Sequence, residues 1–296
     1  MNEKQNIIEY SRTLGFDKIG FVKPNALPNE LQHLEEWLAS GYNASMEWFH
    51  KRKDTLANPF ALLDNLQTIV VTANAYPAKV DFGNTKMKIA KYAVLPDYHK
   101  RIKASLKNLD AFLFEEYNAT SRYFVDSGVL LEKYWATAAG IGWQGKHSLI
   151  ITPEFGSYIN IGILLTTLAI EPDEPAKNHC GNCSKCIEAC PSNAIVKPAV
   201  IDCNNCITYH NIENRGERSS QIMAAIRTSE YIYGCDICAD VCPFNSKIAT
   251  KSEEFHFDLP ELLSGLSKEN FDERMSGYPL KRPGYESLRL CIAAME

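Results

Sequence analysis

Nine of the ten cysteines in this chain lie between residues 180 and 243, at the spacing of metal ligands. A first run reads C-x2-C-x2-C-x3-C before Pro191 and consists of Cys180, Cys183, Cys186 and Cys190. A second run reads C-x2-C-x3-C before Pro243 and consists of Cys235, Cys238 and Cys242. In bacterial ferredoxins, three thiolates of such a run bind one four-iron cubane and the last thiolate binds the other. The two runs therefore predict two 4Fe-4S clusters.

Two cubanes need eight thiolates, and the two runs supply seven. The residues alone leave open whether Cys203 or Cys206, which lie between the runs, supplies the eighth. A zinc site is the main alternative, because paired C-x2-C motifs are common tetrahedral sites. Zinc does not require the x3-C-P extension, however, and here that extension occurs twice. A single cluster with spare cysteines is the other alternative. Cys291 lies outside both runs and is expected to be a buried small hydrophobic residue.

The composition favours a folded protein in a reducing compartment. At 45% hydrophobic residues the chain can bury a core. It contains no uninterrupted run of 18 apolar residues, so no membrane-spanning helix is predicted. The first residues lack a secretory signal, so we expect a cytoplasmic protein whose cysteines are free thiolates. The net charge of −5 argues against nonspecific coating of nucleic acid, although a local basic patch can still bind RNA.

Helix-like and strand-like segments alternate up to about residue 170, which predicts an α+β fold class with a layered N-terminal domain. Helices are expected over 29–39, 99–117 and 128–139, and strands over 68–75, 121–126, 147–151 and 158–167.

The proline-containing segment 171–179 is the best domain boundary in the sequence. We therefore expect a catalytic domain over 1–170 and a two-cluster ferredoxin-like domain over 171–249. A helical segment over 250–296 is expected to pack on the N-terminal domain.

Gly140, Gly142 and Gly145 spell the G-x-G-x-x-G of dinucleotide-binding proteins. That fingerprint must follow a strand and open a helix, whereas here a helix leads in and a strand leads out. We therefore expect a helix end and a glycine turn.

Asp97, Tyr98 and His99 begin like the D-x-H-x-x-G loop of some cobalamin enzymes, but Ile102 stands where the glycine is needed. Asp97 is then either the N-cap of the helix that follows or part of a corrinoid site. In such a site His99 is not expected to replace the lower base of the cobalamin.

Asp126 lies at an apparent junction of a strand with a helix. It is either a helix N-cap or a general acid whose pKa is raised by burial. The basic run from His50 to Lys53 is expected to be a solvated face, and its Lys51 and Arg52 are candidates for contact with nucleic acid.

Beyond the cysteine runs, several segments resemble the epoxyqueuosine reductase family, which is cobalamin-dependent and acts on tRNA. They are WLASGYNASMEWF, KYAVLPDYH, VDSGVLLEKYWATAAGIGWQGKHSLIITPEFGSY, HCGNCSKCIEACPSNAI, CITYHNIENRG, YGCDICADVCPFN and YPLKRPGYESLRL. Together they extend over most of the chain. Leu56 and Leu95 depart from the family pattern, and the chain ends where longer members continue into a HEAT-like helical extension.

The resemblance implies which residues form the site. It assigns Cys180, Cys183, Cys186 and Cys242 to cluster one, and Cys190, Cys206, Cys235 and Cys238 to cluster two, so that Cys203 is extra. It implies that Asp126 is the proton donor. The residues expected at cobalamin are Asp97, Tyr98, His99, Asp126, Lys146, His147, Asp236 and Ile237. The basic residues expected at tRNA are Lys51, Arg52, Arg282 and Arg289.

The implied function is reduction of epoxyqueuosine to queuosine at the tRNA wobble position. Two 4Fe-4S clusters and base-off cobalamin would be the cofactors, and a flavodoxin or ferredoxin the electron donor. Two alternatives are a corrinoid and iron–sulfur electron-transfer protein, and a small-molecule reductase related to reductive dehalogenases.

Overall fold

A four-stranded antiparallel sheet organises the N-terminal half of the protein. The structure is a computed structural model that describes residues 2–126, 128–249 and 251–295. The strand order is β1-β2-β8-β5, and every neighbouring pair is antiparallel. The strands are β1 (Lys18–Val22), β2 (Thr68–Ala75), β5 (Ser121–Phe124) and β8 (Ile159–Thr166). β2 and β8 are the central strands. β2 is almost entirely buried and β8 is buried from Gly162 to Thr166, as expected for strands covered on both faces.

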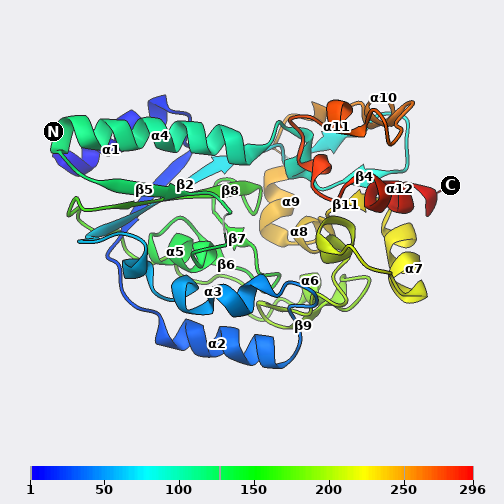
Figure 1. The fold of residues 1–296 in the computed structure, drawn as a ribbon, viewed down its shortest axis with the longest axis horizontal. Helices are drawn as coiled ribbons and strands as arrows, with labels where there is room; N and C mark the ends of the chain where they lie inside the picture. The colour runs from blue at the N-terminus through cyan, green and yellow to red at the C-terminus, as the bar shows by residue number, and fades with distance from the viewer. Residues whose placement is uncertain (1, 127, 250, 296) are drawn as a thin grey trace.

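Helices cover the two faces of this sheet (Figure 1). On one face lie α1 (Glu3–Thr13) and α4 (Tyr98–Tyr117), and α4 buries the stripe Ile102, Leu106, Leu109 and Leu113 against the strands. On the other face lies α5 (Glu132–Ala138), whose Trp135 packs with Ile69 and Val71 of β2. Successive residues of β2 thus enter different cores, as the alternation of a strand requires. Below α5 lie α2 (Pro28–Ala39) and α3 (Trp48–Leu56).

Residues 76–97 leave the sheet and join the cysteine-rich part of the chain. Within this excursion β3 (Val80–Asp81) pairs with β12 (Phe255–His256), and β4 (Lys88–Ile89) pairs with β11 (Tyr231–Tyr233). Both pairs are parallel, so they join segments far apart in the sequence. The excursion ends at η2 (Lys91–Val94), and it sets the start of α4 beside the second cysteine run.

The cysteine-rich part holds short elements between its ligand loops. They are α6 (Lys185–Glu188), β9 (Ile195–Lys197), β10 (Val200–Ile201), a π-helical turn η3 (Tyr209–Glu213), α7 (Ser220–Ser229), α8 (Ile237–Asp240) and α9 (Pro243–Ala249). α6 and α8, one from each cysteine run, pack against each other.

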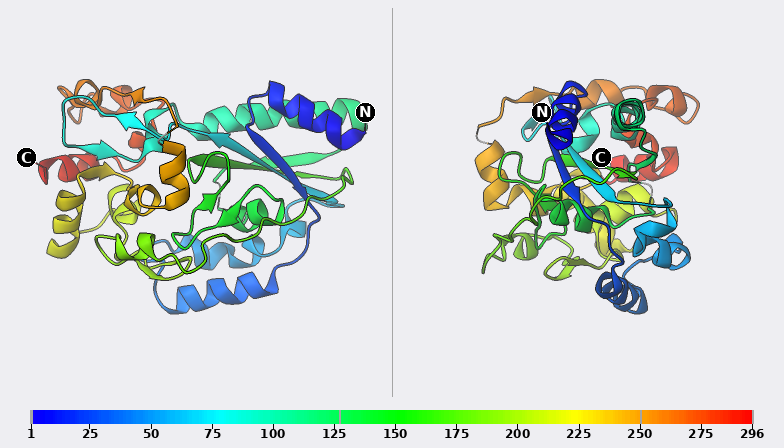
Figure 2. Two further views of the ribbon diagram at one scale, coloured as in Figure 1. Left: turned by 180° about the vertical axis from the view of Figure 1, so that it is seen from behind. Right: turned by 90° about the vertical axis from the view of Figure 1, so that its left-hand side faces the viewer.

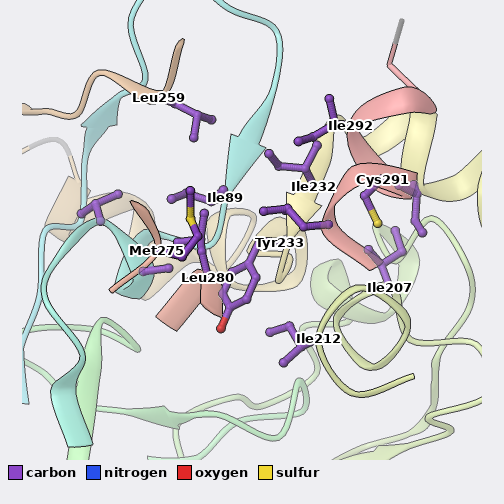
Figure 3. Close-up of a cluster of buried hydrophobic side chains, with 14 of the residues drawn as sticks. Ile89, Ile207, Ile212, Ile232, Tyr233, Leu259, Met275, Leu280, Cys291 and Ile292 are labelled. Atoms are coloured by element: carbon purple, nitrogen blue, oxygen red, sulfur yellow. The ribbon is translucent and has the colours of Figure 1, made fainter. Parts of the chain in front are cut away.

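The C-terminal segment completes a separate core (Figures 1 and 3). Its elements are α10 (Leu259–Leu263), α11 (Phe271–Arg274), η4 (Pro279–Lys281) and α12 (Tyr285–Ala293). Leu280 and Cys291 pack there with Ile89 of the excursion and with Ile232 and Tyr233 of β11. The view from behind in Figure 2 shows the same segment over β11 and away from the four-stranded sheet.

Most expected elements are present, with two differences in extent. The predicted helix over 128–139 is α5, which begins only at Glu132. The predicted strand over 147–151 is the two-residue β7 (Ile150–Ile151), which pairs with β6 (Trp143–Gln144) as a hairpin. Cys291 is fully buried, as expected. Among the described residues, no helix has the length and apolar character needed to cross a bilayer.

Candidate active site and cluster-binding cysteines

The four cysteines expected at cluster one line one cavity. This cavity, of about 90 Å³, is lined by Cys180, Cys183, Cys186 and Cys242 together with Lys146, His147 and His179. Burial raises the pKa of Cys186, and the nearby thiols of Cys242 and Cys180 raise it further. Thiols packed this way favour a bound metal, because metal ions remove the cost of ionising buried cysteines.

The four cysteines expected at cluster two form a second group. Burial raises the pKa of Cys238, and Cys235, Cys206 and Cys190 add to the shift because their thiols are close. Cys206 lies at the start of the segment that leads into η3. Cys203, which the resemblance leaves without a cluster, is close enough to Cys206 for the two thiols to interact. The geometry thus groups Cys206 with three residues of the runs, whereas Cys203 interacts with Cys206 and not with those three.

The arrangement of these cysteines differs from that of a zinc site. Among the residues that the structure describes, no three His, Cys, Asp or Glu side chains converge enough to hold a single metal ion. Ligands of zinc must converge on one point, whereas the ligands of a cubane bind separate irons.

Asp97 and His99 begin α4 as a fixed pair. Asp97 is the N-cap, and its Oδ1 accepts hydrogen bonds from the backbone N–H of His99 at 3.0 Å and from His99 Nδ1 at 2.7 Å. The capping interpretation of Asp97 is therefore confirmed. Ile102 is buried in the helix core, so the chain continues as α4 where a D-x-H-x-x-G loop would turn at a glycine.

Asp126 lies across from the start of α4. The Tyr98 hydroxyl donates to Asp126 Oδ2 at 2.8 Å, and His99 Nε2 is 3.6 Å from the same oxygen. Both ring nitrogens of His99 thus face a carboxylate, which accounts for its raised pKa despite partial burial.

The expectation that Asp126 has a raised pKa is wrong. Burial does push its pKa upward, but hydrogen bonds from His99 and Tyr98, together with the charge of Arg282, outweigh burial and lower it. The two shifts therefore favour the proton of the Asp126–His99 pair on the imidazole rather than on the carboxylate.

The expectation that Asp126 caps a helix is also wrong. α5 begins at Glu132 with Leu131 as its N-cap, six residues beyond Asp126. Asp126 instead has a φ of +44°, in the left-handed region that side chains disfavour. Its backbone N–H donates to Glu132 Oε1 at 2.8 Å. Strained backbone of this kind occurs often at functional sites.

Two charged residues that the sequence did not single out complete this site. Burial and the neighbouring Asp126 raise the pKa of Glu132 to about 8, so it is mostly neutral at pH 7. Lys133 is exposed, and yet desolvation by surrounding protein lowers its pKa. The charges that act on Lys133 include Asp126 and Cys238, so Lys133 lies near both the Asp126 loop and a cysteine expected at cluster two.

Lys146 and His147 lie in the turn of the β6–β7 hairpin rather than beside Asp126. The glycine run precedes them as expected: Gly140 has a φ of +70° and ends the α5 turn, and the strand β6 follows. Lys146 Nζ donates to the carbonyl oxygens of Gly181 and Cys183, both at 2.8 Å. Burial and the charge of Lys133 lower the pKa of His147 to about 4.

Asp236 and Ile237 lie at the start of α8 in the second cysteine run. Asp236 is buried, and its carboxylate accepts the backbone N–H of Lys91 at 2.7 Å. Burial raises its pKa to about 6, although Lys91 opposes this shift. The contact joins the excursion to the second cysteine run.

Two of the four basic residues expected at tRNA are linked to the Asp126 loop. Arg52 of α3 donates to the carbonyl oxygen of Gly128 at 3.5 Å and lies over the Trp48 ring. Arg282 pairs with Glu213 at 2.6 Å and acts electrostatically on Asp126. Lys51 is exposed on α3, and Arg289 is half-buried on α12.

Two family models match the chain. Residues 57–127 match "Epoxyqueuosine reductase QueG, DUF1730", and residues 179–245 match "4Fe-4S double cluster binding domain". The chain therefore carries two 4Fe-4S sites.

Relatives and solved structures give the same result. An epoxyqueuosine reductase of Cellulophaga algicola is 39% identical over 88% of this chain and 84% of its own length. The structure of the Streptococcus thermophilus epoxyqueuosine reductase superposes with a TM-score of 0.89 at 30% identity, over 100% of this chain and 81% of that one. An epoxyqueuosine reductase solved with a tRNA-Tyr epoxyqueuosine-modified stem loop gives a TM-score of 0.87 at 28% identity, over 99% and 80%.

A catabolic reductive dehalogenase is much more distant. It is 15% identical with a TM-score of 0.52, over 97% of this chain and 35% of that protein, which shows similarity of fold alone. The chain thus belongs to the epoxyqueuosine reductase family and is an oxidoreductase with a 4Fe-4S double-cluster domain.

Proposed function

We propose that this protein reduces epoxyqueuosine to queuosine at the wobble position of tRNA, the last step of queuosine biosynthesis. The supporting observation is that Lys133 lies near both Asp126, which faces His99, and Cys238, in a chain of this family, so the proposed proton donor and a cysteine expected at cluster two share one site. Removal of the epoxide oxygen as water consumes two electrons and two protons. A tRNA substrate also implies a cytoplasmic protein.

We expect a cobalamin in the base-off form to bind beside Lys133. The Lys133 side chain is exposed and is acted on by both Asp126 and Cys238, so a large flat cofactor there would lie next to both groups. His99 is held by Asp97 and Asp126 through its two ring nitrogens, so it is not available as an axial ligand. Cobalamin, when bound, would supply a strongly reducing cobalt centre.

The site holds protons at two positions that the reaction can use. One is His99, whose pKa is raised and whose Nε2 is 3.6 Å from Asp126 Oδ2. The other is Glu132, whose pKa is about 8 and whose carboxyl oxygen accepts the backbone N–H of Asp126. Asp126 is the exposed member of the pair, and we assign it the transfer to the leaving oxygen. A substrate that covers Asp126 and His99 would exclude water and weaken the stabilisation of the carboxylate, which favours movement of the proton from His99 to Asp126.

Cysteine ligands position the electron path. Cluster two, with Cys190, Cys206, Cys235 and Cys238 as its proposed ligands, would lie near Lys133, and cluster one would lie in the cavity lined by Cys180, Cys183, Cys186 and Cys242. Lys185 borders the cluster-one cavity, so an acidic flavodoxin or ferredoxin is the kind of donor that would dock there.

Arg52 and Arg282 flank the Asp126 loop and are positioned to contact phosphates of an anticodon stem loop. Lys51 and Arg289 would add contacts further from the loop.

A genetic experiment tests the function directly. A strain that lacks this gene should accumulate epoxyqueuosine in its tRNA, and the wild-type gene should restore queuosine. Unchanged queuosine in the deleted strain would contradict the proposal, provided that no second reductase is encoded.

A further inference from the structure

The turn of the β6–β7 hairpin is docked on the ligand loop of cluster one. Lys146 makes the contact through its two 2.8 Å hydrogen bonds to Gly181 and Cys183. The next residue, His147, lines the same cavity as the four cysteines of that cluster. His147 is 4% exposed, so its ring is enclosed by protein.

The protonated nitrogen of the His147 ring can be assigned from its contacts. Nδ1 accepts a 3.1 Å hydrogen bond from the backbone N–H of Leu149. A ring nitrogen that accepts carries no proton, so the proton of the neutral ring is on Nε2. Nε2 is buried and makes no hydrogen bond within the described part of the chain. A buried donor without an acceptor is rare and requires an explanation.

We propose that the Nε2–H group of His147 donates a hydrogen bond to a sulfur atom of cluster one and raises the reduction potential of that cluster. Reduction adds negative charge to the cluster, and hydrogen bonds to its sulfurs stabilise the reduced form. The inference rests on the proposed ligand set Cys180, Cys183, Cys186 and Cys242.

Trp143 provides an independent sign of the same arrangement. Its indole N–H is also buried and without a partner in the described chain, and its ring packs against Cys180 and Cys242. Two buried donors in this region thus lack an acceptor among the described residues, and His147 is the one that lines the cluster-one cavity.

Isotope labelling provides the first test. Full-length protein with nitrogen-15 histidine is reconstituted anaerobically with iron and sulfide, without cobalamin or tRNA, and then reduced. Pulsed electron paramagnetic resonance should show a nitrogen-15 coupling to one reduced cluster. The coupling should vanish in His147→Leu and persist in His179→Leu, which removes an exposed imidazole from the edge of the same cavity.

Redox titration provides the second test. In His147→Leu one midpoint potential should fall by about 59 mV, a tenfold change in a one-electron equilibrium constant, while the other stays unchanged. His147→Gln, which keeps an N–H group, should restore part of this fall. A general structural defect would move both midpoints.

Absence of a histidine coupling in wild-type protein with a full iron content would overturn the inference and leave the ligand set intact. Equal or absent shifts of the two midpoints in His147→Leu would also overturn it. If that variant loses the cluster, the labelled wild-type protein and His147→Gln still decide the question. Failure of the ligand set itself would appear instead as unchanged iron content in variants of its cysteines.

Discussion

The Tyr98 hydroxyl donates a 2.8 Å hydrogen bond to Oδ2 of Asp126, and so joins the first turn of α4 to a strained loop 28 residues later. The same oxygen faces His99, which lowers the pKa of the carboxylate and raises that of the imidazole. The proposed proton donor is therefore a pair of residues that shares one proton.

The eighth cluster ligand can be identified by iron content. Cys206→Ser should lower the iron content of anaerobically reconstituted protein from about eight towards four, because its thiol belongs to the second group. Cys203→Ser should leave the iron content unchanged. It is the matched control, because Cys203 lies only three residues before Cys206 in the sequence. The reverse pattern would show that Cys203 is the ligand.

The axial coordination of cobalamin follows from the contacts of His99. Because both ring nitrogens face carboxylates, the cob(II)alamin complex should show no nitrogen splitting from an axial ligand in its electron paramagnetic resonance spectrum. His99→Gln should give the same axial signature. A nitrogen splitting that disappears in His99→Gln would show that His99 binds the cobalt.

The rate of a single turnover should fall as pH rises through about 8. Glu132, whose pKa is raised to about 8, loses its proton there, and His99 with its raised pKa changes in the same direction. Both groups act in their protonated forms, so the protonated, active fraction decreases as pH increases.

Glu132→Gln separates these two groups. It keeps an oxygen for the Asp126 N–H but carries no titratable proton, so the rate near pH 7 should be lower and its decline through pH 8 shallower. A wild-type rate that stays constant from about pH 6 to pH 9 would contradict both assignments.

Two features of the fold and site could be predicted from local sequence patterns. The cysteine spacing identified both cluster sites, because ligand geometry is local within each run. The stripe from Ile102 to Leu113 predicted α4, since helical periodicity is strong over twenty residues.

Other features depend on tertiary contacts and could not be predicted from local pattern. The pKa of Asp126 depends on donors 27 and 28 residues away in the chain, and the pKa of Glu132 depends on burial. The parallel pair β4–β11 joins residues more than 140 positions apart. β4 has two residues and β11 has three, so neither strand has a sequence pattern long enough to recognise. Contact of Lys146 and His147 with cobalamin stays a prediction, whereas their place at the cluster-one cavity depends on the docking of the hairpin and could not be predicted locally.

Binding of tRNA should depend most on the basic residues near the Asp126 loop. Arg52→Gln and Arg282→Gln should each weaken binding of an anticodon stem loop and reduce the slope of log affinity against log salt by about 0.7 to 0.9. Lys51→Gln and Arg289→Gln should have smaller effects. Equal losses in all four variants would show that the footprint is broader than the loop.

The central claim is tested most directly by single turnover of an epoxyqueuosine-modified stem loop with reduced, cobalamin-loaded protein. Mass spectrometry should show the wild-type product lighter than substrate by one oxygen atom. Asp126→Asn should retain both clusters and cobalamin and yet react about 100-fold more slowly or worse, because it cannot donate the proton. Chemical reduction removes electron supply from this comparison. Conversion by Asp126→Asn at the wild-type rate would exclude Asp126 from proton transfer, and no conversion by fully loaded wild-type protein would contradict the proposed function.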